Sequence, residues 1–417
     1  MRVAIDFKVM GTEAANRGMG RFAQQQVFEA LRADPSLEVF LILQKPLDPT
    51  KCLYDWQRMD RAHPVWLDPA LDAEAPDART EHERLMLYSH RLQAKLRALG
   101  ADVFHDATPF LQPYYTALTQ TPVVATCYDL IPLIFPYDYL PGLAERDSYL
   151  RMLRNLRTAT RVAAISRSAA TDLHLYTGYR RSQIDITYPF VAEVFQLRMV
   201  DDEARAAGRA AARRAHPTVP ERFFLSVTGI HRSKNLGFLL DAFARVRETR
   251  GWTGLPLVIV LPTYWTRNIF HEKFGSPPDV VLLSEVSDET LRDLYAAAEF
   301  VFQPSLYEGF GYPVAEAMSC GAAVVATRTA SIPEITGDAA LLLDPSDVGA
   351  GAAAIRRLAT DAGARASLRR AALERASMFG EARRLGEATV ACWRAAAGPA
   401  TPRPRIALWS SMPPLDC

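Results

Sequence analysis

The chain has 417 residues, 49% of them hydrophobic and 23% charged, with 48 Lys and Arg against 47 Asp and Glu. This length predicts two domains, and the composition is that of a globular protein. The balanced charge excludes an electrostatic case for nucleic acid as the main partner. The five cysteines are scattered and form no C-x-x-C pair, which favours a reducing compartment and argues against a zinc site.

Short apolar runs alternate with helical segments through the first half of the chain. Val3–Phe7 is predicted as the first strand, a helix follows at about Arg21–Arg32, and Leu37–Leu43 is a second strand. Further strands are expected at Val103–His105, Val123–Cys127 and Val162–Ile165. This alternation predicts a parallel sheet with helices on both faces, in an N-terminal Rossmann-like α/β domain over residues 1–200.

A glycine loop, Asn16–Phe22, follows the first strand. Within it Gly18–Ala23 fits G-x-G-x-x-[G/A], the signature of dinucleotide-binding folds. A nicotinamide enzyme should carry these glycines directly after the first strand and an acidic residue at the end of the second. Here about ten residues separate Phe7 from Gly18, and the second strand runs into Gln44 without a carboxylate. The spacing therefore argues against a nicotinamide cofactor.

The alternating pattern restarts in the second half of the chain. Phe223–Val227 is predicted as a new first strand, with a helix at Asn235–Arg247. Further strands are expected at Leu257–Leu261, Val280–Leu283, Phe300–Gln303 and Ala323–Ala326. We therefore expect a second Rossmann-like domain over residues 201–378. Ligands of such sheets bind at the carboxyl ends of the strands, so the cleft between the domains is the expected site.

The end of the chain follows a different pattern. After a helix over residues 379–397 comes a Pro-rich stretch, and then Arg405–Trp409, which resembles the first strand of the chain. Residues 398–417 are therefore expected to be a linker and the start of a further domain in a longer parent protein. An ordinary C-terminal tail is the alternative.

The densest chemical signal is PSLYEGFGYPVAEAMSCG, Pro304–Gly321. It places Glu308 on a loop after a predicted strand and Glu316 on the helix that follows, with seven residues between them. Two glutamates at this spacing are also compatible with a surface pair at the start of a helix. Their position at the expected cleft favours a ligand-binding role.

The start of that helix is suited to an anion. Pro313 stands at the first helical position, which proline favours. The preceding glycines allow the backbone to approach a ligand closely, and the N–H groups of a helix N-terminus attract a diphosphate. The residues expected to present these groups are Phe310, Gly311 and Tyr312.

A second cluster, Thr228–Leu236, follows the first strand of the second half. It carries Arg232 and Lys234 at the tip of a strand-to-helix loop. Two cations there predict a phosphate clamp, and a solvated basic turn is the alternative.

Together these stretches resemble the retaining, nucleotide-sugar-dependent glycosyltransferases of family 4, which have the GT-B fold. The resemblance covers most of the chain and is strongest over Val286–Asp347. It implies two Rossmann-like domains facing across a cleft, with the helix at 379–397 crossing back to the first domain. By this resemblance Glu308 lies beside the donor sugar and Glu316 binds the ribose.

The resemblance also assigns the rest of the donor site. Lys234 and Arg232 would neutralise the departing diphosphate, and the segment ending at Val286 would line the base pocket. Gly18 and Gly20 would let the backbone close over the donor, with Arg21 contacting phosphate or acceptor. A plain helix-entry turn is the alternative for these glycines.

On the acceptor side, His105–Phe110 and Thr126–Pro132 resemble motifs of the same family. Asp106 belongs to the first motif. In the second motif many relatives have a histidine where this chain has Tyr128, so a histidine contact to the sugar is not expected. Asp129 keeps its position and is a candidate to orient the acceptor or accept its proton. Bracing a turn is the alternative.

The family resemblance implies metal-independent hexosyl transfer with retention, without a cofactor beyond the nucleotide-sugar donor. GDP-mannose is the expected donor, and UDP-glucose, GDP-fucose and dTDP-rhamnose are alternatives. The acceptor is expected to be a growing surface polysaccharide, such as O-antigen, or a lipid-linked glycan. A catalytically inactive sugar-nucleotide- or glycan-binding module of a larger polymerase is the alternative function. A cytoplasmic location is expected, with peripheral attachment to the inner face of the membrane left open.

Overall fold

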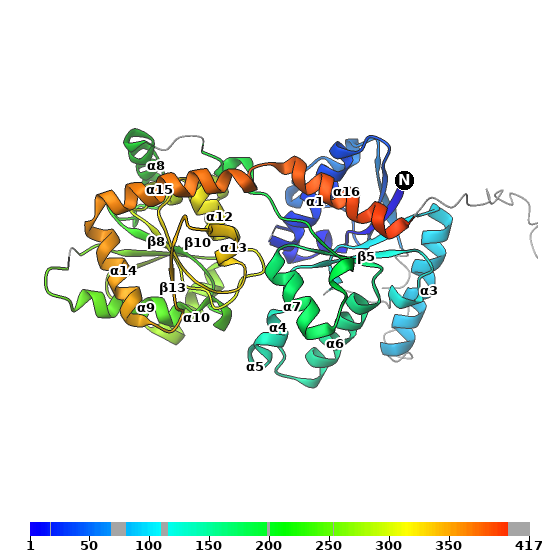
Figure 1. Cartoon of the computed structure of the whole chain (residues 1–417), viewed down its shortest axis with the longest axis horizontal. Coiled ribbons are helices and arrows are strands. Elements are labelled where there is room, and N and C mark those ends of the chain that lie inside the picture. Colours follow the sequence, from blue (N-terminus) through cyan, green and yellow to red (C-terminus); the bar gives the residue numbers. More distant parts are fainter. Residues whose placement is uncertain (17, 68–80, 110–115, 198–200, 253, 399–417) are drawn as a thin grey trace, which may run out of the picture.

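The computed structural model describes residues 1–16, 18–67, 81–109, 116–197, 201–252 and 254–398. It contains two α/β domains side by side, each built on a wholly parallel sheet (Figure 1). Central strands such as β1 have buried side chains on both faces, because helices cover both sides of each sheet. The predicted fold class is therefore confirmed.

The N-terminal sheet has the strand order β3-β2-β1-β4-β5-β6-β7. Its strands are β1 (Arg2–Asp6), β2 (Glu38–Leu43), β3 (Ala62–Trp66), β4 (Val103–Asp106), β5 (Val123–Cys127), β6 (Arg161–Ala164) and β7 (Ile184–Ile186). The α-helices of this half are α1 (Gly18–Ala33), α3 (Glu81–Leu99), α4 (Ile131–Ile134), α5 (Pro136–Tyr139), α6 (Leu143–Thr158) and α7 (Arg167–Thr177).

The C-terminal sheet has the order β10-β9-β8-β11-β12-β13. Its strands are β8 (Phe224–Val227), β9 (Leu257–Leu261), β10 (Val280–Ser284), β11 (Val301–Gln303), β12 (Val324–Thr327) and β13 (Leu341–Leu343). The α-helices of this half are α8 (Asp202–Ala215), α9 (Leu236–Arg247), α10 (Tyr264–Phe274), α11 (Asp288–Ala297), α12 (Tyr312–Ser319), α13 (Ile332–Thr336), α14 (Val348–Thr360) and α15 (Ala362–Ala376).

Both sheets reverse their winding at one point, between β1 and β4 in the first domain and between β8 and β11 in the second. Loops that leave the carboxyl ends of strands at such a switch point form a crevice that binds ligands. The glycine loop follows β1, and the loops that carry Lys234 and Glu308 follow β8 and β11. The topology therefore brings the predicted donor-site segments to the switch points.

The last described helix, α16 (Ala382–Ala397), lies against the N-terminal domain, whereas α15 before it lies on the C-terminal domain (Figure 1). Trp393 of α16 is fully buried, and its Nε1 donates to Nδ1 of His105 at 3.1 Å. A Cβ on Gly386 would lie 2.2 Å from the Glu29 carbonyl oxygen of α1, so this glycine permits close helix packing. The chain thus passes between the domains a second time before its described end.

Two further points concern the ends of elements. The helix expected from Asn235 begins one residue later, because Asn235 adopts a left-handed φ of 51°. The predicted linker and further domain at 398–417 lie outside the described residues, apart from Gly398. Within the described ranges, the helices are too short or too polar to cross a bilayer.

Candidate active site

A cavity of about 490 Å³ lies between the two domains, at the switch points of both sheets. Most of the predicted site residues line it, although they come from widely separated segments. These are Gly18, Arg21, Tyr128, Asp129, Lys234, Glu308, Phe310, Gly311, Tyr312 and Glu316.

An ion pair between Lys234 and Glu308 stands at the wall of this cavity. The Lys234 Nζ lies 2.8 and 2.9 Å from the two Glu308 carboxylate oxygens. The Glu308 side chain is only 9% exposed, and the Ser305 hydroxyl donates to its Oε1 at 2.7 Å. Burial alone would lower the pKa of Lys234, but the Glu308 carboxylate outweighs it and raises that pKa. The lysine is therefore a fixed cation at the site.

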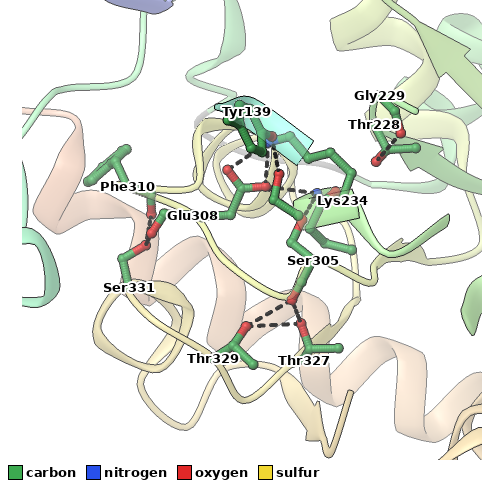
Figure 2. A network of polar contacts seen from close by, with 12 residues as sticks. Tyr139, Thr228, Gly229, Lys234, Ser305, Glu308, Phe310, Thr327, Thr329 and Ser331 are labelled. Atoms are coloured by element: carbon green, nitrogen blue, oxygen red, sulfur yellow. Dashed lines mark hydrogen bonds and ion pairs between the residues drawn. The ribbon is translucent and has the colours of Figure 1, made fainter. Parts of the chain in front are cut away.

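Hydroxyl groups around β12 hold the loop that carries Glu308 (Figure 2). The Ser331 hydroxyl lies 2.9 Å from the carbonyl oxygen of Glu308 and 2.8 Å from that of Phe310. The Thr327 and Thr329 hydroxyls both donate to the Ser305 carbonyl oxygen. These hydroxyls therefore hold backbone carbonyls of the loop from within the C-terminal domain.

The first turn of α12 faces the same cavity. Gly311 precedes it with a φ of 98°, a backbone conformation that favours glycine. The helix then starts at Tyr312, one residue earlier than expected, so that Pro313 is the second helical residue and still lies in the first turn. Its N-terminus presents the positive end of the helix dipole to the cavity, which suits an anionic ligand.

Glu316 lies one turn further along α12. Its Oε2 accepts a hydrogen bond from the Tyr295 hydroxyl at 3.2 Å. Burial raises the pKa of this carboxyl to about 7, while the nearby Arg21 charge and the Tyr295 hydrogen bond act in the opposite direction. Arg21 itself pairs across the domains with Asp288, at 2.6 Å. Asp288 also lines the cavity and was not among the predicted site residues.

Asp129 braces a turn, which was the alternative for this residue, and it also lies at the cavity wall. Its Oδ1 accepts the backbone N–H of Ile131 at 2.9 Å, which braces the turn into α4, and the residue also lines the cavity. Burial raises the pKa of Asp129 to about 6. A carboxyl with that pKa can exchange a proton near neutral pH.

Tyr128 has a mainly structural set of contacts. Its hydroxyl lies 2.9 Å from the Ala107 carbonyl oxygen and 3.3 Å from that of Met19, and its ring meets Phe22 edge-on. Burial raises the pKa of the phenol well above its ordinary value. The tyrosine therefore ties the start of α1 to the segment after β4.

The other four predicted site residues do not line the cavity. They are Gly20, Asp106, Val286 and Arg232. A Cβ on Gly20 would lie 2.3 Å from the Ala15 carbonyl oxygen, so this glycine serves the tight turn into α1. Asp106 is fully buried at the end of β4, and Val286 packs against the hydrophobic core. The Arg232 side chain is 68% exposed and approaches Asp138 at 4.0 Å. For Gly20, the structure therefore supports the alternative, a helix-entry turn, and not the expected contact with a donor.

Several polar groups at the domain interface carried no local signal in the sequence. Ser166 caps α7 by accepting the Ala169 N–H at 3.0 Å. Its hydroxyl also lies 2.6 Å from the Gly309 carbonyl oxygen of the other domain. Ser305 lay within the motif but was not singled out. In the described part of the chain, no group of three or more His, Cys, Asp or Glu side chains is arranged to hold a metal ion.

Two family models match the chain. Residues 67–193 match the model described as Glycosyltransferase Family 4, and residues 221–361 match the model described as Glycosyl transferases group 1. The first covers much of the N-terminal domain, and the second covers the loops that carry Lys234, Glu308 and Glu316.

Curated relatives include two proteins of Escherichia coli. The serotype-specific mannosyltransferase WbdA is 30% identical over 230 residues, which are 54% of this chain and 28% of WbdA. O-antigen chain mannosyltransferase B is 46% identical over 121 residues, which are 28% of this chain and 31% of that protein. The chain therefore matches less than a third of the length of each relative.

Solved structures share the arrangement of both domains. The Anabaena protein Alr3699/HepE in complex with UDP-glucose superposes with a TM-score of 0.66 at 16% identity, covering 94% of this chain and 98% of HepE. At that identity the likeness shows the fold, which is the two-domain arrangement described above.

Proposed function

The chain belongs to the family 4 type of GT-B glycosyltransferases, and we propose that it transfers a hexose from a nucleotide sugar with retention of the anomeric configuration. The observation that carries this proposal is the Lys234–Glu308 pair beside the N-terminus of α12, in a cavity between the domains. A cation and a helix N-terminus at one end of a cavity suit a diphosphate.

The donor would bind with its diphosphate between Lys234 and the first turn of α12. Negative charge develops on this diphosphate as the sugar–phosphate bond breaks. A cation about 4 Å away stabilises that charge by roughly 4 kcal/mol at an intermediate effective dielectric. Because Glu308 already holds Lys234, and Ser305 in turn holds Glu308, little reorganisation is required. Glu308 would then lie beside the sugar ring.

The acceptor hydroxyl would attack on the face from which the diphosphate departs, through an oxocarbenium-like state. Asp129 lines the cavity on the side of the N-terminal domain and is placed to orient this hydroxyl. With a pKa of about 6, it is mainly ionised at neutral pH and can accept the hydroxyl proton. Retention then follows from same-face attack without a covalent enzyme intermediate.

GDP-mannose is the proposed donor. The relatives named above are mannosyltransferases, which supports the sugar. The Asp288 carboxylate at the cavity wall supports the base, because guanine presents two N–H donors on one edge, which a carboxylate can accept. UDP-glucose is the main competing donor, since HepE was crystallised with it.

The proposed acceptor is a growing surface polysaccharide or a lipid-linked glycan, reached from the inner face of the membrane. Support comes from α5 and α6, which follow the Asp129 turn. Tyr137 is 87% exposed and Leu143 is 78% exposed, and α6 also presents Arg154 and Arg157 to solvent. Exposed apolar side chains suit the headgroup region of a bilayer.

The deciding experiment incubates the purified chain with GDP-mannose, UDP-glucose, GDP-fucose or dTDP-rhamnose and a panel of mannose-terminated acceptors. The expected result is an α-linked product from GDP-mannose, with the anomeric configuration assigned by NMR. A ligand present at 100 times its dissociation constant should also stabilise the fold by about 2.7 kcal/mol in a thermal-shift assay. Absence of both stabilisation and transfer with GDP-mannose would overturn the proposed donor, and stabilisation without transfer by any donor would favour the inactive binding module.

A further inference from the structure

Both chain neighbours of Glu308 are hydrogen-bonded to one helix of the opposite domain. The Tyr307 hydroxyl donates to the Asp172 carboxylate in α7. On the other side of Glu308, the Gly309 carbonyl oxygen accepts from the Ser166 hydroxyl at 2.6 Å. The backbone that carries Glu308 is therefore held from both sides by the N-terminal domain.

The contact at Gly309 requires close approach of the two domains. A Cβ at this position would lie 2.3 Å from the Tyr128 carbonyl oxygen and 3.2 Å from the Asp129 Cβ. A backbone carbonyl cannot rotate away as a flexible side chain can, so any side chain here would push the domains apart. Gly309 thus allows the loop to dock directly against the turn that carries Asp129.

The loop that carries Lys234 has a matching contact. The hydroxyl of its neighbour Ser233 lies 2.8 Å from the Tyr139 hydroxyl of α5, in the N-terminal domain. The Ser233 carbonyl oxygen also accepts the Leu306 N–H at 2.7 Å, which joins the two loops of the C-terminal domain (Figure 2 shows Tyr139 beside this network). Both members of the Lys234–Glu308 pair are therefore flanked by residues bonded across the cleft.

A purely structural role does not account for these bonds. Capping of α7 needs only the acceptor lone pair of Ser166, which takes the Ala169 N–H, whereas its proton is directed to Gly309. Tyr307 is buried, and its hydroxyl donates to Asp172 in the other domain. Both donors meet these partners only where the two domains are in contact.

We propose that Ser166 and Asp172 are positioning residues, which orient the Glu308 loop for transfer only when the N-terminal domain closes on it. This rests on the proposed function, in which Glu308 lies beside the donor sugar. Closure would then assemble the reactive geometry as well as exclude water. The donor's nucleotide would still bind to the C-terminal domain without these contacts.

The test uses the full chain with Tyr307→Phe and Asp172→Ala, which remove the interdomain hydrogen bond, and Asp172→Asn, which keeps an acceptor for the tyrosine. Tyr179→Phe is the matched control, because that buried hydroxyl donates to the Ala159 carbonyl oxygen within the N-terminal domain. We expect Tyr307→Phe and Asp172→Ala to lower kcat about tenfold, which corresponds to roughly 1.4 kcal/mol, with little change in the KM for GDP-mannose. Asp172→Asn should retain most of the activity.

A second readout does not depend on turnover. Hydrogen exchange of the backbone amides at 305–311 should be faster in Tyr307→Phe and in Gly309→Ala than in the wild type and in Tyr179→Phe. If the wild type is active and the variants keep its kcat, the positioning role is wrong while the proposed function stands. If the wild type is inactive with every donor, the proposed function fails. If hydrogen exchange in the variants is unchanged, the proposal that the N-terminal domain holds the Glu308 loop fails as well.

Discussion

Lys234 and Glu308 are 74 positions apart in the chain, yet the Lys234 Nζ lies within 2.9 Å of both Glu308 carboxylate oxygens at the cavity. The pair is partly withdrawn from water, so each charge depends on the other for compensation. The proposed mechanism adds a third partner, the donor diphosphate, on the open side of Lys234. The same residue thereby serves both stability and the proposed transfer.

Lys234→Met removes the charge and keeps most of the side-chain length. We expect kcat/KM for GDP-mannose to fall by at least about a hundredfold, as when one preorganised donor is removed from a developing anion. The free energy of unfolding should decrease by about 3 kcal/mol, because Glu308 is left buried without a counter-charge. Steady-state kinetics and urea unfolding measure these two effects. The exposed Lys273 provides the control Lys273→Met, and equal behaviour of the two variants would contradict the assignment.

The two buried carboxyls make stability depend on pH. Burial raises the pKa of Glu316 to about 7 and that of Asp129 to about 6, above the ordinary values of 4.5 and 3.8. Between about pH 4 and pH 7 the unfolded chain therefore loses these protons before the folded chain does. The free energy of unfolding should fall as the pH rises through this window, and the contribution should level off above pH 7.

Glu316→Gln tests this pH dependence. The glutamine does not ionise. Between pH 4.5 and pH 7.5 the free energy of unfolding should therefore fall by about 2 kcal/mol less in the variant than in the wild type. Urea unfolding at several pH values measures the slope. Glu203→Gln, at an exposed position of α8, should keep the wild-type slope. A wild-type slope in Glu316→Gln would show that this carboxyl is not protonated in the fold.

At the scale of elements, α16 completes the N-terminal domain from the far end of the chain. Trp393 donates to Nδ1 of His105, so the proton of that imidazole lies on Nε2, which faces the Thr126 hydroxyl at 2.9 Å. Burial lowers the pKa of His105 to about 3, which keeps the ring neutral. The helix therefore covers the ends of β4 and β5, and Tyr128 and Asp129 come directly after β5.

Trp393→Ala should lower the free energy of unfolding by about 3–5 kcal/mol, because it leaves a large cavity and removes the donor to His105. Thermal and urea unfolding are the measurements. Arg383, also on α16, is largely exposed and pairs with Glu387 of the same helix at 2.7 Å, so Arg383→Ala should change stability by less than about 0.5 kcal/mol. A small effect of Trp393→Ala would mean that α16 contributes little to this core.

In the whole molecule, a carboxylate of the C-terminal domain bonds to the N-terminal domain at α7. Glu334 of α13 accepts the backbone N–H groups of Arg167 at 2.8 Å and Ser168 at 3.1 Å, at the N-terminus of α7. The Tyr188 hydroxyl also donates to this carboxylate. A negative group at a helix N-terminus is stabilised by the free N–H groups and the helix dipole. These contacts join α13 of the C-terminal domain to the N-terminus of α7, next to Ser166.

Glu334→Ala should shift the balance between closed and open forms toward the open form by about fivefold, for a loss of about 1 kcal/mol. Small-angle X-ray scattering should then give a larger radius of gyration than for the wild type. Glu272→Ala, at an exposed position of α10, should leave the scattering curve unchanged. An unchanged curve for Glu334→Ala would show that other interdomain contacts suffice for closure.

Local patterns predicted the architecture well. The expected strand Val3–Phe7 is β1 shifted by one residue, and Val123–Cys127 is β5 with the same bounds. Such runs are readable because strands buried on both faces need continuous apolar residues. The start of α12 was readable for a related reason, since its glycine and proline have fixed backbone requirements.

Side-chain direction was less predictable than element position. Gly20 and Gly18 look alike in the glycine loop, but only Gly18 lines the cavity, whereas Gly20 packs against Ala15. Arg232 and Lys234 share one loop, yet the first turns toward Asp138 and the second toward Glu308. Side chains two residues apart in a tight turn point in different directions. No local sequence pattern specifies which of the two contacts the other domain.

The fold class and the segments that carry Lys234, Glu308 and Glu316 were readable from the sequence, because in each segment strand, loop and helix follow one another along the chain. Which groups of the N-terminal domain meet them follows only from the folded structure. The contacts of Arg21 with Asp288 and of Ser166 with Gly309 join residues 267 and 143 positions apart. They depend on how two separately folded sheets pack across a cleft, and that packing leaves no periodic signal in either segment.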